Sequence, residues 1–325
     1  ETFKDKSDLS YCFYQRALEV AENSGVIGFI SSRYFMESPT GRNLRGYLRD
    51  NCRINRIVDF YGEEIFPGVG VAAAIYFISK EVDNDNEIEV WKYQGSKLKN
   101  VEPKDFEIFK VNQDKISEDR WILIPDEKRN ILERIENSCT IRLGDIVESF
   151  QGIITGCDKA FIMDENTIKA LAIEEELLKP WIKNSHVDRY RVRNSNLKLI
   201  YSDFIDEPLK YPNSIMHIEQ YRERLENRRE CRKGLRLWHQ LQWGRNPELF
   251  IKEKIVYPYK STGNRFALDR RGCFCSADVY SFVLKDGVEG YSLPFLLGVL
   301  NSSLYEFYFK LFAKKMGKDI YDYYP

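Results

Sequence analysis

The sequence predicts an α/β protein with two domains: part of a helix-flanked sheet, then a mixed domain richer in strands. Within the first 110 residues, segments with helical periodicity alternate with short apolar runs typical of strands. From about residue 140, short strand-like runs are separated by Gly, Pro and Asn, which is typical of a β-rich domain. A length of 325 residues is enough for two domains that each bury a core.

Three segments open the first domain. Residues 7–24 repeat apolar side chains at three- and four-residue spacings, which predicts an amphipathic helix. The continuous apolar run at 26–30 is typical of a strand buried on both faces of an α/β sheet. Residues 40–50 predict a second helix, which carries Leu44 and Leu48 on one side.

Two further strands are predicted at 56–60 and 71–78. Because their connection is too short for a crossover helix, we expect them to form an antiparallel pair. The order helix, strand, helix, strand, strand is how a Rossmann-like sheet ends, with a reversed last strand. No glycine-rich cofactor loop precedes these elements, and the edge that earlier strands would pair with is left uncovered.

A transitional region separates the two domains. It contains a strand-like alternation at 88–93 and a charged helical segment at 127–136. We therefore expect a first domain at 1–110, a linker at 111–140 and a second domain at 141–325.

Charge is distributed unevenly, although the net charge is only −1. Residues 1–140 hold 20 Lys and Arg against 25 Asp and Glu, whereas residues 141–325 hold 29 against 25. This difference indicates that the second half faces a polyanion. A chance difference between two domains remains the alternative.

Composition excludes several classes of protein. No run of eighteen apolar residues is present, and the N-terminal residues do not form a signal peptide. The seven cysteines are scattered and the three histidines have no metal-ligand spacing, so we expect free thiols and no metal centre. A location in the reducing cytoplasm follows from this cysteine usage.

A series of short motifs runs through nearly the whole chain. The first group lies at 6–9, 13, 25–30, 44–48 and 64–67. The second group lies at 151–162, 176–183, 189–190, 266–269 and 296–302. In this order the motifs resemble the end of the catalytic domain, and then the C-terminal specificity domain, of TaqI-like, gamma-class adenine-N6 DNA methyltransferases and the type IIG restriction enzymes built on them.

The resemblance implies a function in a restriction–modification system. It implies the C-terminal part of a Rossmann-like methyltransferase sheet, followed by a mixed α/β target-recognition domain that binds double-stranded DNA. In the intact enzyme, S-adenosylmethionine supplies the methyl group. The alternative is a non-enzymatic DNA-binding specificity subunit that acts with a partner methyltransferase chain.

The sequence departs from the family at its catalytic centre. Neither an Asn-Pro-Pro-Tyr nor an Asp-Pro-Pro-Tyr motif occurs, and the glycine-rich S-adenosylmethionine loop is missing. We therefore expect this chain to bind no S-adenosylmethionine and to be inactive alone. The missing N-terminal methyltransferase region would lie in the same polypeptide or in a partner chain.

Phe66 is the residue that the resemblance assigns to the flipped base. The matching position in the family stacks on the adenine that leaves the duplex, and a methylated base must be held outside the helix in this way. The Pro and Gly beside Phe66 suit an exposed, rigid loop. Alternatively, Phe66 packs against the end of the sheet.

Basic residues of the second domain are candidates for contacts with phosphates and base edges. Segment 216–245 interleaves Arg and Lys with Trp238, His239 and Trp243, as a DNA-binding surface does, but its glutamates can also pair with the arginines on a solvated helix face. The polar loop 260–265 suits base-edge contacts, whereas ordinary surface charge is the alternative for the others. The candidates are Thr155, Lys159, Lys183, Arg189, Arg191, Arg232, Lys233, Arg236, Arg245, Lys260 and Arg265.

Overall fold

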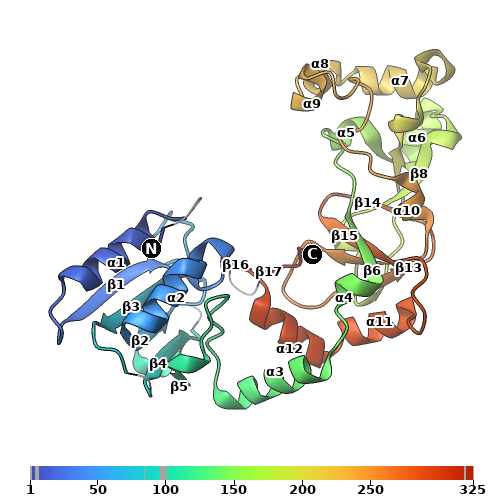
Figure 1. The fold of residues 1–325 in the computed structure, drawn as a ribbon. Helices are drawn as coiled ribbons and strands as arrows, with labels where there is room; N and C mark the ends of the chain where they lie inside the picture. Colours follow the sequence, from blue (N-terminus) through green and yellow to red (C-terminus); the bar gives the residue numbers. More distant parts are fainter. Residues whose placement is uncertain (1, 4–6, 84, 96–100, 318–319, 325) are drawn as a thin grey trace. The chain divides into compact units, whose positions relative to one another are not determined.

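The computed structural model describes residues 2–3, 7–83, 85–95, 101–317 and 320–324 (Figure 1). The chain divides into two units. The first comprises Glu1–Thr140 together with Tyr308–Tyr321, so a segment near the end of the chain returns to it. The second comprises Ile141–Phe307 and Asp322–Pro325.

A five-stranded sheet forms the centre of the first unit, in the order β1-β3-β2-β4-β5. Its strands are β1 (Val26–Ser32), β2 (Arg53–Asp59), β3 (Ala73–Ser79), β4 (Glu87–Tyr93) and β5 (Phe106–Asn112). The predicted antiparallel pairing of β2 with β3 is confirmed. β1 also runs antiparallel to β3, β4 runs parallel to β2, and β5 runs antiparallel to β4.

One face of this sheet is covered by helices α1 (Ser10–Val20) and α2 (Arg42–Asn51). Alternate positions of the strands point towards them, because side chains alternate between the two faces of a strand. The register places Tyr76, Ile57 and Val90 in one row on this side, and all three are buried. Leu44 and Leu48 of α2 belong to the same buried cluster, as the helical spacing predicts.

The segment 111–140, expected as a linker, contributes to the first unit. Val111, Ile116, Trp121 and Leu123 belong to the same buried cluster as the sheet. Helix α3 (Asp126–Ser138) follows them. The guanidinium of Arg45, itself buried, donates hydrogen bonds to the carbonyl groups of Ser38, Glu118 and Asp119 at 2.8, 2.7 and 2.6 Å, which ties this segment to α2.

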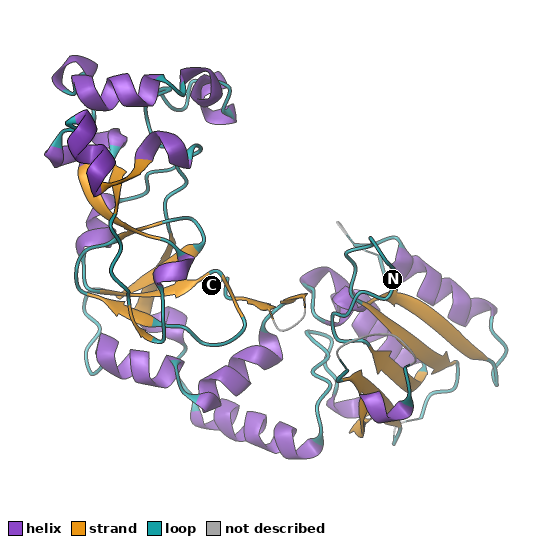
Figure 2. Ribbon diagram, turned by 180° about the vertical axis from the view of Figure 1, so that it is seen from behind, coloured by secondary structure: helices purple, strands orange, loops and turns teal. Residues whose placement is uncertain are grey.

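The other face of the sheet exposes apolar side chains. A row formed by Ile30, Ile75, Val58, Trp91 and Ile108 crosses all five strands in register. Figure 2 shows the strands of this unit in front of α1 and α2. Ile30 and Ile108 keep 47% and 46% of their surface exposed. The expectation that β1 is buried on both faces is therefore wrong, because β1 lies at the edge of the sheet with one face uncovered.

The second unit contains two sheets. One has the order β6-β15-β11-β13-β9, and the other has the order β14-β8-β10-β7. The first sheet comprises β6 (Val147–Gln151), β9 (Tyr190–Arg191), β11 (Lys254–Pro258), β13 (Ala267–Asp269) and β15 (Val279–Leu284). The second comprises β7 (Ile162–Asp164), β8 (Leu178–Ile182), β10 (Leu197–Ile200) and β14 (Phe274–Cys275). The β13–β9 and β14–β8 pairs are parallel, whereas β10–β7, β10–β8, β11–β13, β11–β15 and β15–β6 are antiparallel. The predicted mixed α/β class is confirmed.

Short helices surround these sheets and their shared buried cluster, in which the Phe250 and Phe274 rings stack at 4.8 Å. They are α4 (Leu143–Ile146), α5 (Asp158–Phe161), α6 (Glu165–Leu171), α7 (Pro212–Glu219), α8 (Arg222–Glu226), α9 (Arg229–Arg232), α10 (Pro247–Ile251) and α11 (Leu293–Leu300). The remaining elements are β12 (Lys260–Ser261), α12 (Ser303–Phe312), β16 (Lys315–Gly317) and β17 (Ile320–Asp322). No helix in the described ranges is long and apolar enough to cross a membrane.

The two rows of the first sheet predict opposite responses to the same substitution. The double variant Ile30→Lys/Ile108→Lys should keep the free energy of unfolding within about 0.5 kcal/mol of the wild type and reduce self-association, because both side chains lie on the exposed row. Ile57→Lys, on the covered row, should lower the free energy of unfolding by more than about 3 kcal/mol, because it buries an unpaired charge. Urea denaturation and light scattering measure the two effects, and equal destabilisation by both variants would contradict the assignment of the faces.

Candidate nucleic-acid interface

The loop that carries Phe66 joins β2 to β3, and a buried ion pair fixes its origin. Asp59, the last residue of β2, accepts hydrogen bonds from Arg33 Nε at 2.9 Å and Arg33 Nη2 at 3.2 Å. Arg33 Nη1 also donates to Glu37 at 2.6 Å. The same Asp59 carboxylate accepts the backbone N–H of Tyr61 at 2.8 Å, so the first residues of the loop are tied to the sheet.

The returning C-terminal segment holds the same point from the other side. Lys315 Nζ donates to the Tyr61 carbonyl oxygen at 2.7 Å and lies 3.5 Å from the centre of the Tyr61 ring. The hydroxyl groups of Tyr61 and Tyr321 are 3.2 Å apart. Tyr61 has a φ of 50°, a left-handed conformation that non-glycine residues adopt only when the surroundings enforce it.

Phe66 lies beyond this anchor at a closed turn. The Val69 N–H donates to the Phe66 carbonyl oxygen at 3.0 Å, and Gly68 has a φ of 79°. A Pro followed by a Gly with positive φ is the signature of a type II turn. The side chain of Phe66 is 46% exposed, so it is not packed into the end of the sheet.

A cavity of about 550 Å³ lies beside this loop within the first unit. Residues 62–64 and 69–72, on either side of Phe66, line it together with Arg33, Tyr34 and Lys314–Met316. Tyr34 is 45% exposed, and Lys314 Nζ lies 5.2 Å from the centre of its ring. The cavity thus has an aromatic ring and both cationic and acidic side chains in its lining, the acidic ones being Glu37, Glu63 and Glu64.

In the second unit, the first part of the motif 151–162 (residues 151–156, here called the opening motif) passes close to the backbone of Cys275 and Ser276. A side chain at Gly152 would meet the Ser276 carbonyl oxygen at 2.0 Å, so only Gly fits. Gly156 has a φ of 78°, which also requires Gly. Thr155, a predicted DNA contact, is buried and its hydroxyl lies 2.6 Å from Asp158 Oδ1, so the structure places it inside the unit.

Arg228 connects this motif to the basic segment. Its side chain is buried, and its guanidinium donates to the carbonyl oxygens of Leu225, Thr155, Trp238 and Gln240 at 2.9, 3.1, 2.9 and 2.9 Å. The sequence suggests a solvent-facing cation here, and only the fold shows that Arg228 is internal. Its five donors in a rigid fork suit the carbonyl groups of an irregular segment.

Five of the predicted contact residues are engaged by neighbouring groups. The engaged residues and their partners are Lys183 with Asp158, Arg189 with Glu306 and the Asn264 carbonyl, Arg236 with Asp203, Arg245 with Gln151, and Arg265 with Asn184 and Ser261. All these contacts order the surface, and the ion pairs of Lys183, Arg189 and Arg236 also reduce the charge available for phosphates.

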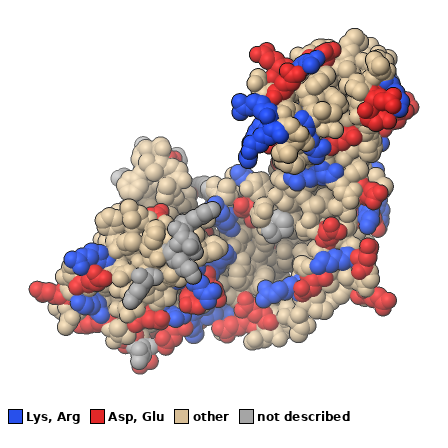
Figure 3. Space-filling model, turned by 45° about the horizontal axis from the view of Figure 1, so that its top comes forward, with Lys and Arg blue, Asp and Glu red and all other residues tan. Residues whose placement is uncertain are grey.

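The other predicted cations are exposed and form no ion pair within the described part of the chain: Lys159, Arg191, Arg232, Lys233 and Lys260. Arg224 and Arg229 share this state. Figure 3 shows Lys and Arg side chains gathered on the part of this unit that carries α8 and α9. Arg222, in contrast, pairs with Glu219 and Glu226, so this portion of the segment is the solvated helix face that the alternative predicted.

The aromatic residues of the segment divide in the same way. Trp243 is 37% exposed and lies beneath the Arg236 guanidinium, 5.8 Å from ring centre to Cζ. His239 is buried, and desolvation by burial lowers its pKa below the ordinary value. His239 is therefore neutral near pH 7 and adds no positive charge to the surface.

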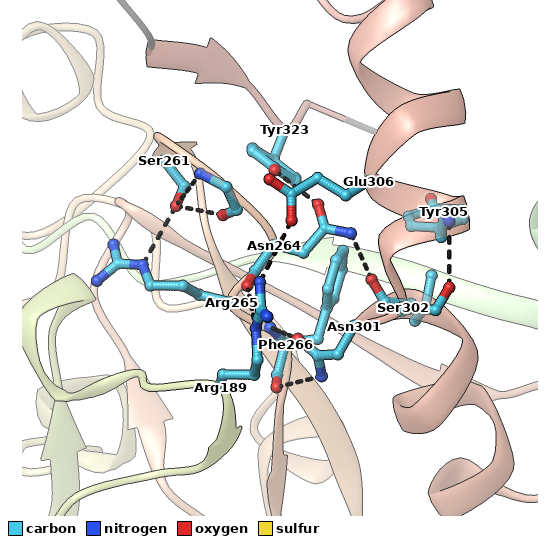
Figure 4. A network of polar contacts seen from close by, with 12 residues as sticks. Arg189, Ser261, Asn264, Arg265, Phe266, Asn301, Ser302, Tyr305, Glu306 and Tyr323 are labelled. Atoms are coloured by element: carbon cyan, nitrogen blue, oxygen red, sulfur yellow. Dashed lines mark hydrogen bonds and ion pairs between the residues drawn. The ribbon is translucent and has the colours of Figure 1, made fainter. Parts of the chain in front are cut away.

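Two buried asparagines that the sequence did not single out order the polar loop 260–265 (Figure 4). Asn301 accepts the Phe266 N–H at 3.1 Å and donates to the Phe266 carbonyl oxygen at 2.9 Å. Asn264 donates to the Leu300 carbonyl oxygen at 2.6 Å and accepts the Tyr323 hydroxyl at 2.8 Å. The motifs at 266–269 and 296–302 thus hold each other in place.

Arg228→Met should destabilise the backbone of residues 225–242 while leaving the surface charge pattern nearly intact. It leaves buried carbonyl groups without donors, which should lower the free energy of unfolding of the second unit by about 3 kcal/mol or more. Hydrogen exchange should accelerate across 225–242. The matched control Arg229→Met alters an exposed arginine of α9 and should change stability by less than about 0.5 kcal/mol; equal protection in both variants would contradict the role of Arg228.

Two protein families match the chain. Residues 1–66 match the Eco57I restriction-modification methylase family, and residues 179–324 match the TaqI-like C-terminal specificity domain. The type II methyltransferase M.BanIII of Aneurinibacillus aneurinilyticus is 25% identical over 341 residues, covering 92% of this chain and 58% of that protein. M.BstVI of Geobacillus stearothermophilus, also a type II methyltransferase, is 25% identical and covers 98% of this chain and 59% of its own.

Among solved structures, the type IIL restriction-modification enzyme MmeI in complex with DNA has a similar fold. The TM-score is 0.59 at 12% identity, over 91% of this chain and 37% of MmeI. The chain spans about three fifths of the length of the methyltransferases that it matches.

Proposed function

Because the chain belongs to the Eco57I-type restriction–modification methylases that end in a TaqI-like specificity domain, we propose that it recognises the target sequence of a site-specific adenine-N6 DNA methyltransferase. The first unit, of which residues 1–110 form the main part, would then be the end of the catalytic domain, and the second unit within residues 141–325 would be the target-recognition domain. A protein with chromosomal and invading DNA as its substrates would act in the cytoplasm.

The observation that carries this proposal is the exposed charge around α9 on a rigid backbone. Arg229, Arg232 and Lys233 are exposed and form no ion pair with any described residue, while the buried Arg228 anchors the backbone beside them. Cations held ready at the surface neutralise phosphates without first breaking internal pairs. Thr155, Lys183, Arg189, Arg236, Arg245 and Arg265 would support this surface, and Lys159, Arg191 and Lys260 would extend it.

The chain should bind duplex DNA with a strong dependence on salt. With about four phosphate contacts, the affinity should fall roughly 100-fold between about 50 and about 200 mM NaCl in filter binding. Arg232→Gln should reduce the salt slope by about one, because it removes one phosphate contact. Arg222→Gln, which removes a cation already paired with glutamates, is the matched control and should leave the slope unchanged. No binding at low salt would refute the proposal.

We propose that Phe66 stacks on the flipped adenine in the intact enzyme. Its exposure, the closed turn at Phe66–Val69 and the anchored start of the loop support this role. The neighbouring cavity lies on the same loop.

In the intact protein, Phe66→Ala should therefore lower the rate of methylation. Loss of base–aromatic stacking, about 1–3 kcal/mol, corresponds to roughly 5- to 150-fold. Phe66→Trp should retain most of the rate because it keeps an aromatic face. Val69→Ala, at an equally exposed position of the loop, is the control, and an undiminished rate in Phe66→Ala would exclude stacking.

S-adenosylmethionine would be the methyl donor of the intact enzyme, but the described residues do not fit it. In the described part of the first unit, the glycine-containing loop that follows β2, with Gly68 and Gly70, leads into strand β3 and not into a helix, so no helix N-terminus faces it. We therefore propose that this chain alone neither binds the donor nor methylates DNA. Transfer of labelled methyl groups by the purified chain would overturn this.

The missing methyltransferase region would cover the exposed row of the first sheet and pair with the β1 edge. Apolar rows and free strand edges are normally covered in soluble proteins. The same surface would serve if the chain were a non-enzymatic specificity subunit that binds a separate methyltransferase chain. The Ile30→Lys/Ile108→Lys variant should then lose association with the catalytic region, and unchanged association would show that it docks elsewhere.

A further inference from the structure

Two exposed leucines lie on the basic loop that follows α9. Leu235 and Leu237 keep 64% and 58% of their surface exposed. Arg232 and Lys233 precede them; both are exposed, and neither forms an ion pair among the residues that the structure describes. An exposed apolar side chain on a basic loop buries little surface and so adds little to the stability of the fold. Stability therefore does not explain why a leucine occupies position 235.

The backbone presents Leu235 outwards through a helix-ending motif. Gly234 has a φ of 69°, its N–H donates to the Cys231 carbonyl oxygen at 2.9 Å, and the Leu235 N–H donates to the Glu230 carbonyl oxygen at 2.9 Å. This is the Schellman pattern, in which the residue after Gly usually packs an apolar side chain against the helix. Here the facing residue is Glu230, which accepts a hydrogen bond from Gln242 at 3.0 Å, and Leu235 stays exposed.

The loop is also fixed on its C-terminal side. The Leu237 N–H donates to the Gln240 side chain at 3.0 Å, and the Arg228 guanidinium binds the carbonyl groups of Trp238 and Gln240. Arg236, between the two leucines, pairs with Asp203 at 3.0 Å. Because these contacts fix the conformation of the loop, a side chain on it can enter a tight contact with another molecule without displacing the loop backbone.

We propose that Leu235 is an apolar wedge that inserts between adjacent base pairs, while Arg232 and Lys233 hold nearby phosphates. This rests on the proposed DNA-recognition function and adds to it a contact that forms no hydrogen bond with a base. Insertion of Leu unstacks a base step and kinks the duplex, and the cost is smallest at flexible pyrimidine–purine steps. The wedge therefore selects sequence through the deformability of one step.

A wedge fits the geometry better than reading of a groove by a helix. α9 comprises four residues, Arg229–Arg232, which is too short to lie along the major groove as a recognition helix. The leucine lies beyond the helix, at the turn. Cations on the preceding turn complement the phosphates that flank an inserted side chain.

The test is selection of bound duplexes from a randomised pool by the full chain and its variants. The wild type should enrich sequences that carry a pyrimidine–purine step at one fixed position. Leu235→Ala should reduce the preference for that step about tenfold, while other preferences and the salt slope persist. Leu235→Met, which keeps a long apolar side chain, should retain the preference for that step.

Leu209→Ala is the matched control, because Leu209 is 95% exposed on the same unit but lies outside the basic loop; it should select as the wild type does. If the wild type binds no duplex, the proposed function fails, and the wedge with it. If Leu235→Ala selects the same step as the wild type, the wedge alone is refuted. A strict thymine requirement that uracil abolishes would also refute it, since that outcome indicates contact with the thymine methyl group.

Discussion

The hydrogen bonds of the buried Arg228 guanidinium are the constraint on which the surface of the second unit depends. The segment 225–242 has little regular structure, so its carbonyl groups cannot satisfy one another, and buried carbonyls without donors are costly. One guanidinium supplies donors to three of them, those of Leu225, Trp238 and Gln240, and also to the Thr155 carbonyl group in the opening motif. A lysine has no such planar fork. The buried Arg228 guanidinium thus fixes the backbone that carries the exposed cations of α9.

Buried arginines have a similar role in the first unit. Arg45 of α2 binds the carbonyl groups of Ser38, before this helix, and of Glu118 and Asp119, and Arg33 binds Asp59 at the end of β2. Each joins irregular chain to a regular element. A buried charge without partners is strongly destabilising, so these arginines can be buried only when their hydrogen-bond partners are in place. The loop that carries Phe66 inherits its position from them.

The cations of the second unit thus divide into two groups with different tasks. Those paired with carboxylates or carbonyl groups, such as Arg236 and Arg189, shape the surface. Those left exposed around α9 carry the charge that a polyanion would meet. A preorganised surface loses little conformational entropy on binding, and this favours recognition by a braced loop over recognition by a flexible one.

The sequence by itself determined the order of elements in the first unit, the antiparallel β2–β3 pair, the mixed class of the second unit and the family, because these depend on local periodicity, loop length and collinear motifs. It did not determine which face of β1 is covered, since one apolar run looks the same at an edge and at the centre of a sheet. Nor did it separate Arg228 from Arg232, because both are arginines of one charged segment. The partners that bind Arg228 and Arg236, Thr155 and Asp203 respectively, are distant in sequence, and only tertiary structure brings them together.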